Sequence, residues 1–174
     1  SYLKQTICAF ERYQINTVIE SNIIDGIAKK ALKTKTGARG LMSIIETAVK
    51  EFKYELPSSK CKYLVLSESI LINPKEYLKW ILKNPKENEN LFYATYFKNL
   101  ESTLSQIIKT KITISNSAQN YWIKHHKKLG ISLKSSHNDC INNIKKYKKI
   151  FKKNKSFEIK EEHCIWSEGD WMNW

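Results

Sequence analysis

An arginine between two glycines is the residue of this chain best suited to a ligand contact. Arg39 lies in the stretch TKTGARGLMSIIETAV, residues 34–49, between Gly37 and Gly40. From Leu41 onward, apolar residues recur at three- and four-residue intervals, which predicts an amphipathic helix beginning at this turn. A cation in the first turn of a helix is mildly unfavourable by itself, whereas glycines let a backbone or a ligand approach closely. Arg39 is therefore a candidate binding residue, although a solvated cation beside a capped helix start also fits the pattern.

Cysteine and histidine offer two further kinds of chemistry, zinc binding and nucleophilic catalysis. The four cysteines are widely spaced: Cys8, Cys61, Cys140 and Cys164. They do not form the pattern of a disulfide framework and fit a reducing compartment. His137 with Cys140, and His163 with Cys164, are each a ligand pair without the second pair that a structural zinc site needs. No base is placed beside a thiol, so we expect no metal site and no catalytic residue in this chain.

Charge is the most unusual bulk property of the chain. The 174 residues carry a net charge of +13, and lysine far outnumbers arginine. A basic chain favours an anionic partner, but abundant Lys, Asn and Ile together also fit the codon bias of an AT-rich genome. No apolar run approaches the roughly 20 residues that cross a bilayer. The first residues, SYLKQTICAF, lack an initiator Met and the order of a signal peptide, so we expect an excised piece of a longer protein.

The pattern of apolar residues and helix caps in residues 1–73 predicts a small α+β unit. The expected elements are a helix over residues 1–13, a strand within QINTVIES, a helix after Ser21 as N-cap, a helix from the Thr36 cap to Tyr54, and a strand within CKYLVLSES. Their order is helix, strand, helix, helix, strand, which is typical of a compact α+β domain.

Residues 74–174 predict a different, mainly helical extension. Asn73, Pro74 and Glu76 form a good helix start, and helices are expected over residues 74–83, 88–109, 117–129 and 137–153, with Gly130 ending the third. Residues 1–73 have a net charge of +4 and residues 74–174 a net charge of +9. The lysine-rich segment NNIKKYKKIFKKNK is either a solvated helix packed on one side or a basic helix that touches nucleic acid or membrane. Residues 154–174 form an acidic, Trp-rich tail that either docks a partner or folds back.

The segment GIAKKALKTKTGARGLMSIIETAV, continued by YELPS, resembles the small C-terminal domain of the ClpX family of AAA+ unfoldases. The likeness extends through LKQTICAF, INTVIES and YLVLSES and covers about residues 1–70, with KTGARGL as its most specific part. It implies the small lid domain of helices with a short β-sheet. By this resemblance, Gly37, Ala38 and Arg39 are the nucleotide-binding sensor-2 residues, and Arg39 reaches the phosphates of ATP. Met42 stands where the family usually has a second basic residue.

The resemblance also implies the partners and the missing parts. ATP with magnesium would be bound mostly by a large domain, because this chain has no GxxxxGK[ST] loop and should not hydrolyse ATP by itself. The family assembles as homo-hexamers that unfold tagged or unfolded proteins and deliver them to the ClpP peptidase. An organelle, either the mitochondrial matrix or the plastid stroma, is the expected location, with the bacterial cytoplasm as the alternative.

Two other functional classes remain open for this chain. One is a stand-alone basic interaction module that binds nucleic acid through its lysine-rich helices. Nucleic acid is disfavoured as a partner because no element interleaves aromatic residues with arginines at base-reading spacing, and a membrane partner is not expected. The other is an adaptor that has lost its motor and recruits a protein partner through the Trp-rich tail. The resemblance says nothing about residues 74–174, whose function the sequence leaves open.

Overall fold

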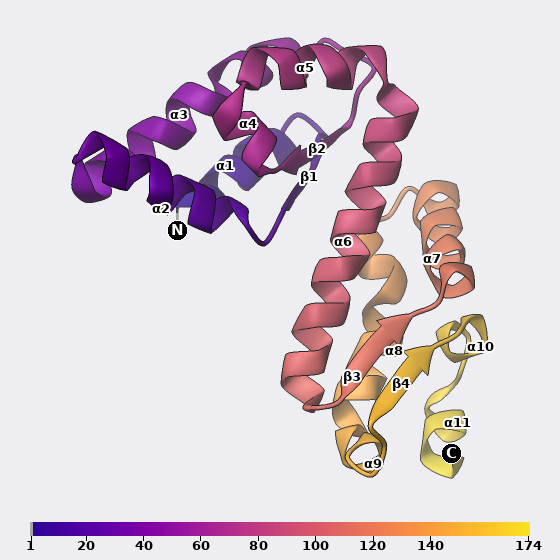
Figure 1. The fold of residues 1–174 in the computed structure, drawn as a ribbon. Helices are drawn as coiled ribbons and strands as arrows, with labels where there is room; N and C mark the ends of the chain where they lie inside the picture. Colours follow the sequence, from indigo (N-terminus) through magenta and orange to yellow (C-terminus); the bar gives the residue numbers. More distant parts are fainter. Residues whose placement is uncertain (1) are drawn as a thin grey trace. The chain divides into compact units, whose positions relative to one another are not determined.

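A computed structural model describes residues 2–174, apart from the side chain of Ala38. The described chain divides into two units, unit 1 up to Tyr96 and unit 2 from Phe97 to Trp174 (Figure 1). Helices predominate in both units, and each unit contains one small parallel sheet. The expected α+β fold is therefore confirmed. None of the helices in the described residues combines the length and the apolar composition that crossing a membrane requires.

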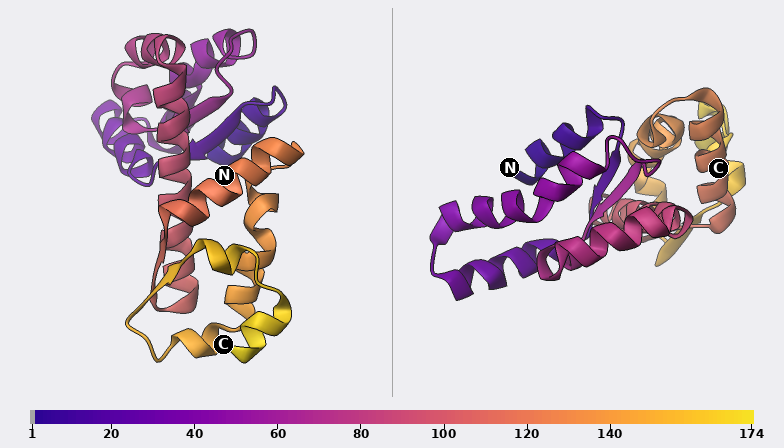
Figure 2. Two further views of the ribbon diagram at one scale, coloured as in Figure 1. Left: turned by 90° about the vertical axis from the view of Figure 1, so that its right-hand side faces the viewer. Right: turned by 90° about the horizontal axis from the view of Figure 1, so that it is seen from above.

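Unit 1 is built around the parallel pair β1–β2. In chain order its elements are α1 (Tyr2–Glu11), β1 (Asn16–Ile19), α2 (Ile23–Thr34), α3 (Gly37–Glu55), β2 (Tyr63–Leu66), α4 (Glu68–Ile72), α5 (Pro74–Lys83) and the first part of α6 (Pro85–Ile108). The register runs from Asn16 opposite Tyr63 to Ile19 opposite Leu66. Parallel strands need a crossover connection, and here α2 and α3 supply it. The two helices run side by side to the turn that joins them (Figure 2).

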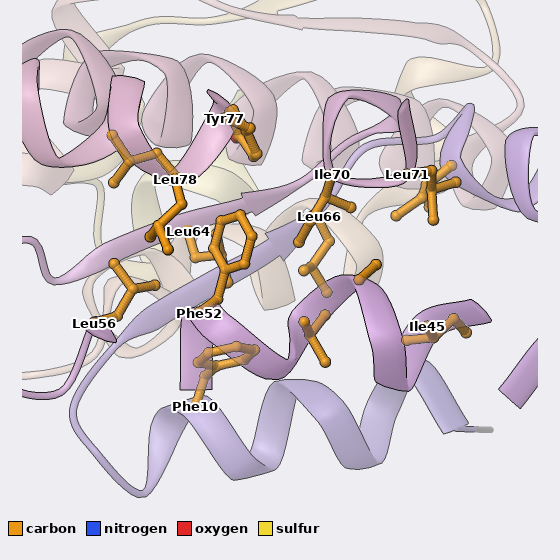
Figure 3. Close-up of a cluster of buried hydrophobic side chains, with 14 of the residues drawn as sticks. Phe10, Ile45, Phe52, Leu56, Leu64, Leu66, Ile70, Leu71, Tyr77 and Leu78 are labelled. Atoms are coloured by element: carbon orange, nitrogen blue, oxygen red, sulfur yellow. The ribbon is translucent and has the colours of Figure 1, made fainter. Parts of the chain in front are cut away.

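The core of unit 1 lies where α1, α3 and α5 meet the sheet. Phe10, Phe52 and Leu64 are fully buried there, and Figure 3 shows side chains from these elements converging. Helix α5 belongs to the same core, since Tyr77 donates a hydrogen bond from its hydroxyl to the Val65 carbonyl at 2.9 Å. Packing therefore continues past residue 73, where the amino-acid composition changes.

Unit 2 contains a second parallel pair, β3–β4. Its elements are the second part of α6, β3 (Lys111–Ile114), α7 (Asn116–Leu129), α8 (Leu133–Lys146), α9 (Lys148–Phe151), β4 (Ser156–Ile159), α10 (Glu161–Cys164) and α11 (Glu168–Asn173). The register runs from Lys111 opposite Ser156 to Ile114 opposite Ile159. The sequence analysis missed both strands, although the alternating residues of TKITIS and KSFEIK carry a period-two pattern. The C-terminal tail folds back into unit 2, because Trp171 is fully buried.

The two units share an order of elements: a helix, a first strand, two long crossover helices, a parallel second strand and a short helix, with the short helix α9 added before β4 in unit 2. Backbone details repeat as well. A residue with positive φ precedes each first strand by two positions, Gln14 in unit 1 and Lys109 in unit 2. Each first crossover helix ends in a left-handed residue, Lys35 or Gly130. In both units the residue after the first strand donates its amide to the last residue of the second strand.

The helix ends show which sequence signals were reliable. Asn73 caps α5 as expected, accepting from the Glu76 amide, and Gly130 ends α7 with φ +62°. The expected Ser21 cap is wrong, since Asn22 is the N-cap position of α2 and makes no capping hydrogen bond. The expected helix over 137–153 is also wrong: Ser132 caps α8 and starts it earlier. The helix then breaks at Tyr147, so that α9 is separate.

Two histidines are buried in unit 2. His137 is 4 % exposed and lies edge-on to Trp122 with ring centroids 5.6 Å apart. Burial lowers its pKa to about 4, and the positive charges of Lys134 and Lys145 act in the same direction. His163 is equally buried and its Nδ1 accepts a hydrogen bond from the Lys160 amide at 2.8 Å. Burial lowers its pKa too, so both rings are neutral in the folded protein at pH 7.

Because the pKa values of these buried histidines are lowered, we expect unit 2 to lose stability in mild acid. The unfolded state binds protons near pH 6.5, whereas folded His137 does so only near pH 4. The contribution of neutral His137 to the free energy of unfolding is therefore fully present above about pH 6.5. It falls by about 3 kcal/mol as the pH drops from about 6.5 to about 4. Urea unfolding followed by tryptophan fluorescence measures this, because four of the five tryptophans lie in unit 2.

The variant His137→Gln supplies the comparison for this prediction. Glutamine cannot titrate in this range, so the variant should show a shallower loss of stability between pH 6.5 and 4. Burial raises the pKa of Glu101, which opposes the histidines near the acid end of the window, and subtracting the two profiles removes that contribution. Identical profiles for the two proteins would contradict the assignment.

Candidate functional site

The turn between α2 and α3 depends on a glycine. Lys35 ends α2 in the left-handed conformation with φ 52°, and Gly37 follows with φ +61° at the start of α3. Residues other than glycine are strained in that region. A Cβ at Gly37 would meet nothing within 4 Å, so the constraint is the backbone conformation and the space above this turn is open.

Gly40 is required for a different reason, the close approach of Thr36. A Cβ built on Gly40 would lie 1.7 Å from Thr36 Oγ1 and 2.4 Å from Thr36 Cβ. Thr36 occupies the N-cap position of α3, as expected, but its side chain does not make the capping hydrogen bond. Its hydroxyl instead shares a hydrogen bond of 2.9 Å with Thr34. The first amides of α3 therefore have neither an intrahelical acceptor nor a side-chain cap.

Arg39 stands on this uncapped first turn. Its side chain is exposed, and within residues 2–174 its guanidinium makes no hydrogen bond or ion pair. The side chain of Ala38 lies outside the described part of the structure. The structure thus brings Gly37 and Arg39 together on one open turn, with a planar cation free to contact a ligand.

The surroundings of the turn are positively charged. Residues 26–45 contain five basic residues and no acidic residue. Three of the lysines, Lys29, Lys30 and Lys33, line a hollow of about 350 Å³ that also reaches Glu68 on α4. Lys30 donates a hydrogen bond from Nζ to the Leu71 carbonyl at 2.9 Å and so joins α2 to α4. The charge of this region favours an anionic ligand.

The two His–Cys pairs of unit 2, His137 with Cys140 and His163 with Cys164, pack inside the unit. Burial raises the pKa of Cys140, and burial with Glu161 nearby raises that of Cys164 to about 12. Both thiols therefore remain protonated and unreactive at neutral pH. Among the residues that the structure describes, no three His, Cys, Asp or Glu side chains gather as metal ligands. The buried rings of His137 and His163 pack against tryptophans.

Known proteins resemble part of this chain. The ATP-dependent Clp protease ATP-binding subunit ClpX of Borrelia duttonii is 37% identical over 73 residues, which cover 41% of this chain and 17% of the Borrelia protein. The protein of the same name from Bacteroides thetaiotaomicron is 42% identical over 66 residues, covering 37% of this chain and 16% of its own. No protein-family model matches the chain, and no solved structure is significantly similar to it.

These similarities are partial on both sides. The matched segment spans no more than 17% of the length of either relative and less than half of this chain. Within that extent the relation is clear, because several ClpX proteins from different bacteria match at 37–42% identity. A segment of this chain is related to the ATP-binding subunit ClpX of the Clp protease.

Proposed function

We propose that residues 1–73 are the small C-terminal lid domain of an ATP-dependent, ClpX-like AAA+ unfoldase, and that Arg39 is its sensor-2 arginine. The observation that carries the proposal is the free guanidinium of Arg39 on the open, uncapped first turn of α3, within a chain that contains a ClpX-related segment. Gly37 and Ala38 belong to the same turn. The boundaries at 73 and 153 are proposed as the limits of the ClpX-like segment and of the helical extension. They are not packing boundaries, because α5 shares the core of unit 1 and the two compact units divide after Tyr96.

The groups at the start of α3 suit a contact with a phosphate. Arginine offers a planar fork of donors that can hold two phosphate oxygens at once, which lysine cannot do. The free amides at the start of α3 attract the same anion. Without nucleotide, the helix dipole and the guanidinium repel each other mildly. Bound phosphate would relieve that repulsion, so Arg39 and the helix start would bind it together.

Hydrolysis of ATP would supply the free energy for the motion of the lid. This chain would supply one contact to the phosphates of the nucleotide. Open space above Gly37 and the absence of acidic residues over 26–45 fit a phosphate group. No carboxylate stands on the turn to hold magnesium, so the magnesium and most of the nucleotide would be bound by a large domain. The residues present would sense the phosphate and would not hydrolyse it.

In this proposal the lid acts within a larger assembly. The whole protein would be a homo-hexamer that unfolds tagged or unfolded proteins and delivers them to the ClpP peptidase. The angle between lid and large domain would follow the state of the nucleotide, in the manner of other switches held by a phosphate group. Its compartment would be an organelle, the mitochondrial matrix or plastid stroma, or otherwise the bacterial cytoplasm.

Sequencing the transcript upstream of Ser1 tests the proposal most directly. A GxxxxGK[ST] loop and an acidic strand end within the preceding roughly 300 residues would provide the ATP site. A targeting segment ahead of them would decide the compartment. A start codon close to Ser1 would refute the motor and favour a stand-alone interaction module.

Replacing Arg39 should impair the intact ATPase without unfolding it. Loss of a charge-assisted contact to phosphate is expected to lower kcat/KM for ATP by roughly 10- to 100-fold for Arg39→Ala. Arg39→Lys should recover only part of this, since the charge returns without the fork. Arg12→Ala is the matched control, because Arg12 is also exposed and is the only other arginine of the chain. Wild-type, ATP-driven protein unfolding by Arg39→Ala would rule out the sensor role.

Gly40→Ala should distort the turn that carries Arg39. The new Cβ would overlap Thr36, and overpacking of this kind costs about 1–3 kcal/mol. A melting curve of the 174-residue chain should show unit 1 unfolding several degrees earlier, at about 4–8 °C per kcal/mol. The double variant Gly40→Ala/Thr36→Gly removes both overlapping atoms and should regain most of the loss.

Gly169→Ala is the control for this measurement. A Cβ there would meet Ser167 Oγ at an ordinary 3.6 Å, so the melting temperature should stay unchanged or rise slightly, because alanine favours a helix over glycine. An unaltered curve for Gly40→Ala would show that Thr36 does not hold the position found in the structure.

A further inference from the structure

Seven lysines gather at the end of unit 2 where both strands begin. We name this surface the basic corner, and it consists of Lys109, Lys111, Lys148, Lys149, Lys152, Lys153 and Lys155. The register places Lys111 opposite Ser156, so the starts of β3 and β4 are adjacent, and α9 lies beside them (Figure 1). Thr110 donates a hydrogen bond from Oγ1 to the Phe151 carbonyl at 3.2 Å, which fastens the α6–β3 turn to α9. Segments some forty residues apart in the chain therefore form one surface.

The ammonium groups of the basic corner are exposed and unpaired. In the part of the chain that the structure describes, none of the seven side chains makes an ion pair or a hydrogen bond. No acidic residue occurs between Asp139 and Glu158. The acidic residues of the neighbouring α11 are already engaged, Glu168 by Lys146 and Asp170 by Ser167. The positive charge of the corner is consequently not neutralised within the unit.

Lysine-rich composition alone does not account for this concentration, because unit 1 provides an internal comparison. The same connection in unit 1, from the end of the crossover helices to the second strand, is covered by residues 50–62. These contain four lysines and two glutamates, and one of the lysines, Lys62, donates to the Pro57 carbonyl at 3.3 Å. Residues 145–155 contain seven lysines and no acidic residue. Both segments share one codon usage and one place in the fold, yet only unit 2 is strongly basic there.

We propose that the basic corner binds the phosphodiester backbone of duplex nucleic acid, without reading its sequence. Lysine is a point charge that suits individual phosphates, and the corner has no arginine for bidentate contacts to bases. The lysine-bearing segments themselves offer no exposed ring on which a single strand could stack, since Phe151 is fully buried and Tyr147 half-buried. The exposed ring nearby, Trp174, belongs to the C-terminal segment and packs on Phe151 with ring centroids 5.4 Å apart. The absence of arginine and of interleaved aromatics was the reason to disfavour a nucleic-acid partner. That absence excludes base readout, whereas contacts to the phosphates of the backbone do not need these residues.

A membrane surface fits the corner less well. Apolar side chains that enter the interface strengthen association with anionic lipid beyond what positive charge gives, and the aromatic residue of α9 points into the core. The exposed apolar residues nearby, Met172 and Trp174, lie in the α11 segment that also carries two carboxylates. Helix α11 packs on α9 through Phe151 and Trp171, with ring centroids 6.5 Å apart. A flat bilayer would therefore also approach Glu168 and Asp170, whose charges oppose it. A duplex can contact the corner without covering α11.

Binding of a short random-sequence duplex by the 174-residue chain, followed by fluorescence anisotropy, tests the proposal. The logarithm of the binding constant should fall with the logarithm of the salt concentration with a slope of about −4 to −6, as expected for five or so phosphate contacts. The variant Lys152→Gln/Lys153→Gln/Lys155→Gln should bind at least about tenfold more weakly at low salt, with a slope shallower by about 3. Its melting curve should be unchanged, because exposed lysines contribute little to stability.

A matched variant distinguishes the corner from bulk charge. Lys124→Gln/Lys128→Gln/Lys134→Gln removes the same charge from exposed positions of α7 and α8 and should change the slope by less than about 1. Equal losses in the two variants would overturn the assignment of the surface, as would the absence of salt-dependent duplex binding. Corner-dependent capture by phosphatidylserine vesicles without duplex binding would overturn it in favour of lipid. These outcomes are independent of the proposed ATPase, whose test lies in Arg39.

Discussion

The parallel pairing of two four-residue strands is the constraint on which each unit depends. Parallel neighbours cannot be joined by a tight turn, so the chain must leave the sheet and return through a crossover. So short a pair is not stable alone, and the crossover helices must also cover it. In unit 1, Phe52 of α3 and Leu64 of β2 are buried together for this reason. The turn between α2 and α3 is left at the tip of the helices, away from the strands (Figure 2), where its residues are free to serve binding.

The two units differ in how they start the second crossover helix, and the difference bears on function. In unit 2, Ser132 accepts a hydrogen bond from the Ser135 amide, so the start of α8 is satisfied internally. In unit 1, Thr36 turns its hydroxyl towards Thr34 and leaves the start of α3 uncapped. Arg39 and Ser135 occupy the same position, three residues after the N-cap position. Unit 1 thus leaves the first amides of α3 without a side-chain cap beside Arg39, whereas unit 2 caps one amide of α8 through Ser132 and has a lysine, Lys134, in its first turn.

The sequence was most informative where one residue controls the local backbone. Asn73 and Gly130 marked helix ends correctly, and the period of the apolar residues gave α3 and α5 nearly to the residue. Strands β3 and β4 were missed although their residues alternate, because each has only two apolar residues among its four, whereas β2 is a continuous apolar run. Their pairing across the crossover depends on tertiary contacts. The close approach of Thr36 to Gly40 could not be predicted either, because a threonine before a helix usually indicates a side-chain cap. The basic corner depends on the β3–β4 register, which no local pattern reveals.

The choice between arginine and lysine separates the two positively charged surfaces. Of the 30 basic residues only Arg12 and Arg39 are arginine, so the chain uses lysine almost wherever a cation is enough. A merely solvated cation at the α2–α3 turn could equally be lysine, whereas a contact that grips two oxygens of one phosphate could not. The basic corner consists of lysine alone, which suits separate phosphates along a backbone. In the two proposals, the same fold would carry two kinds of anion chemistry, a directed contact at the helix tip of unit 1 and a diffuse one at the strand starts of unit 2.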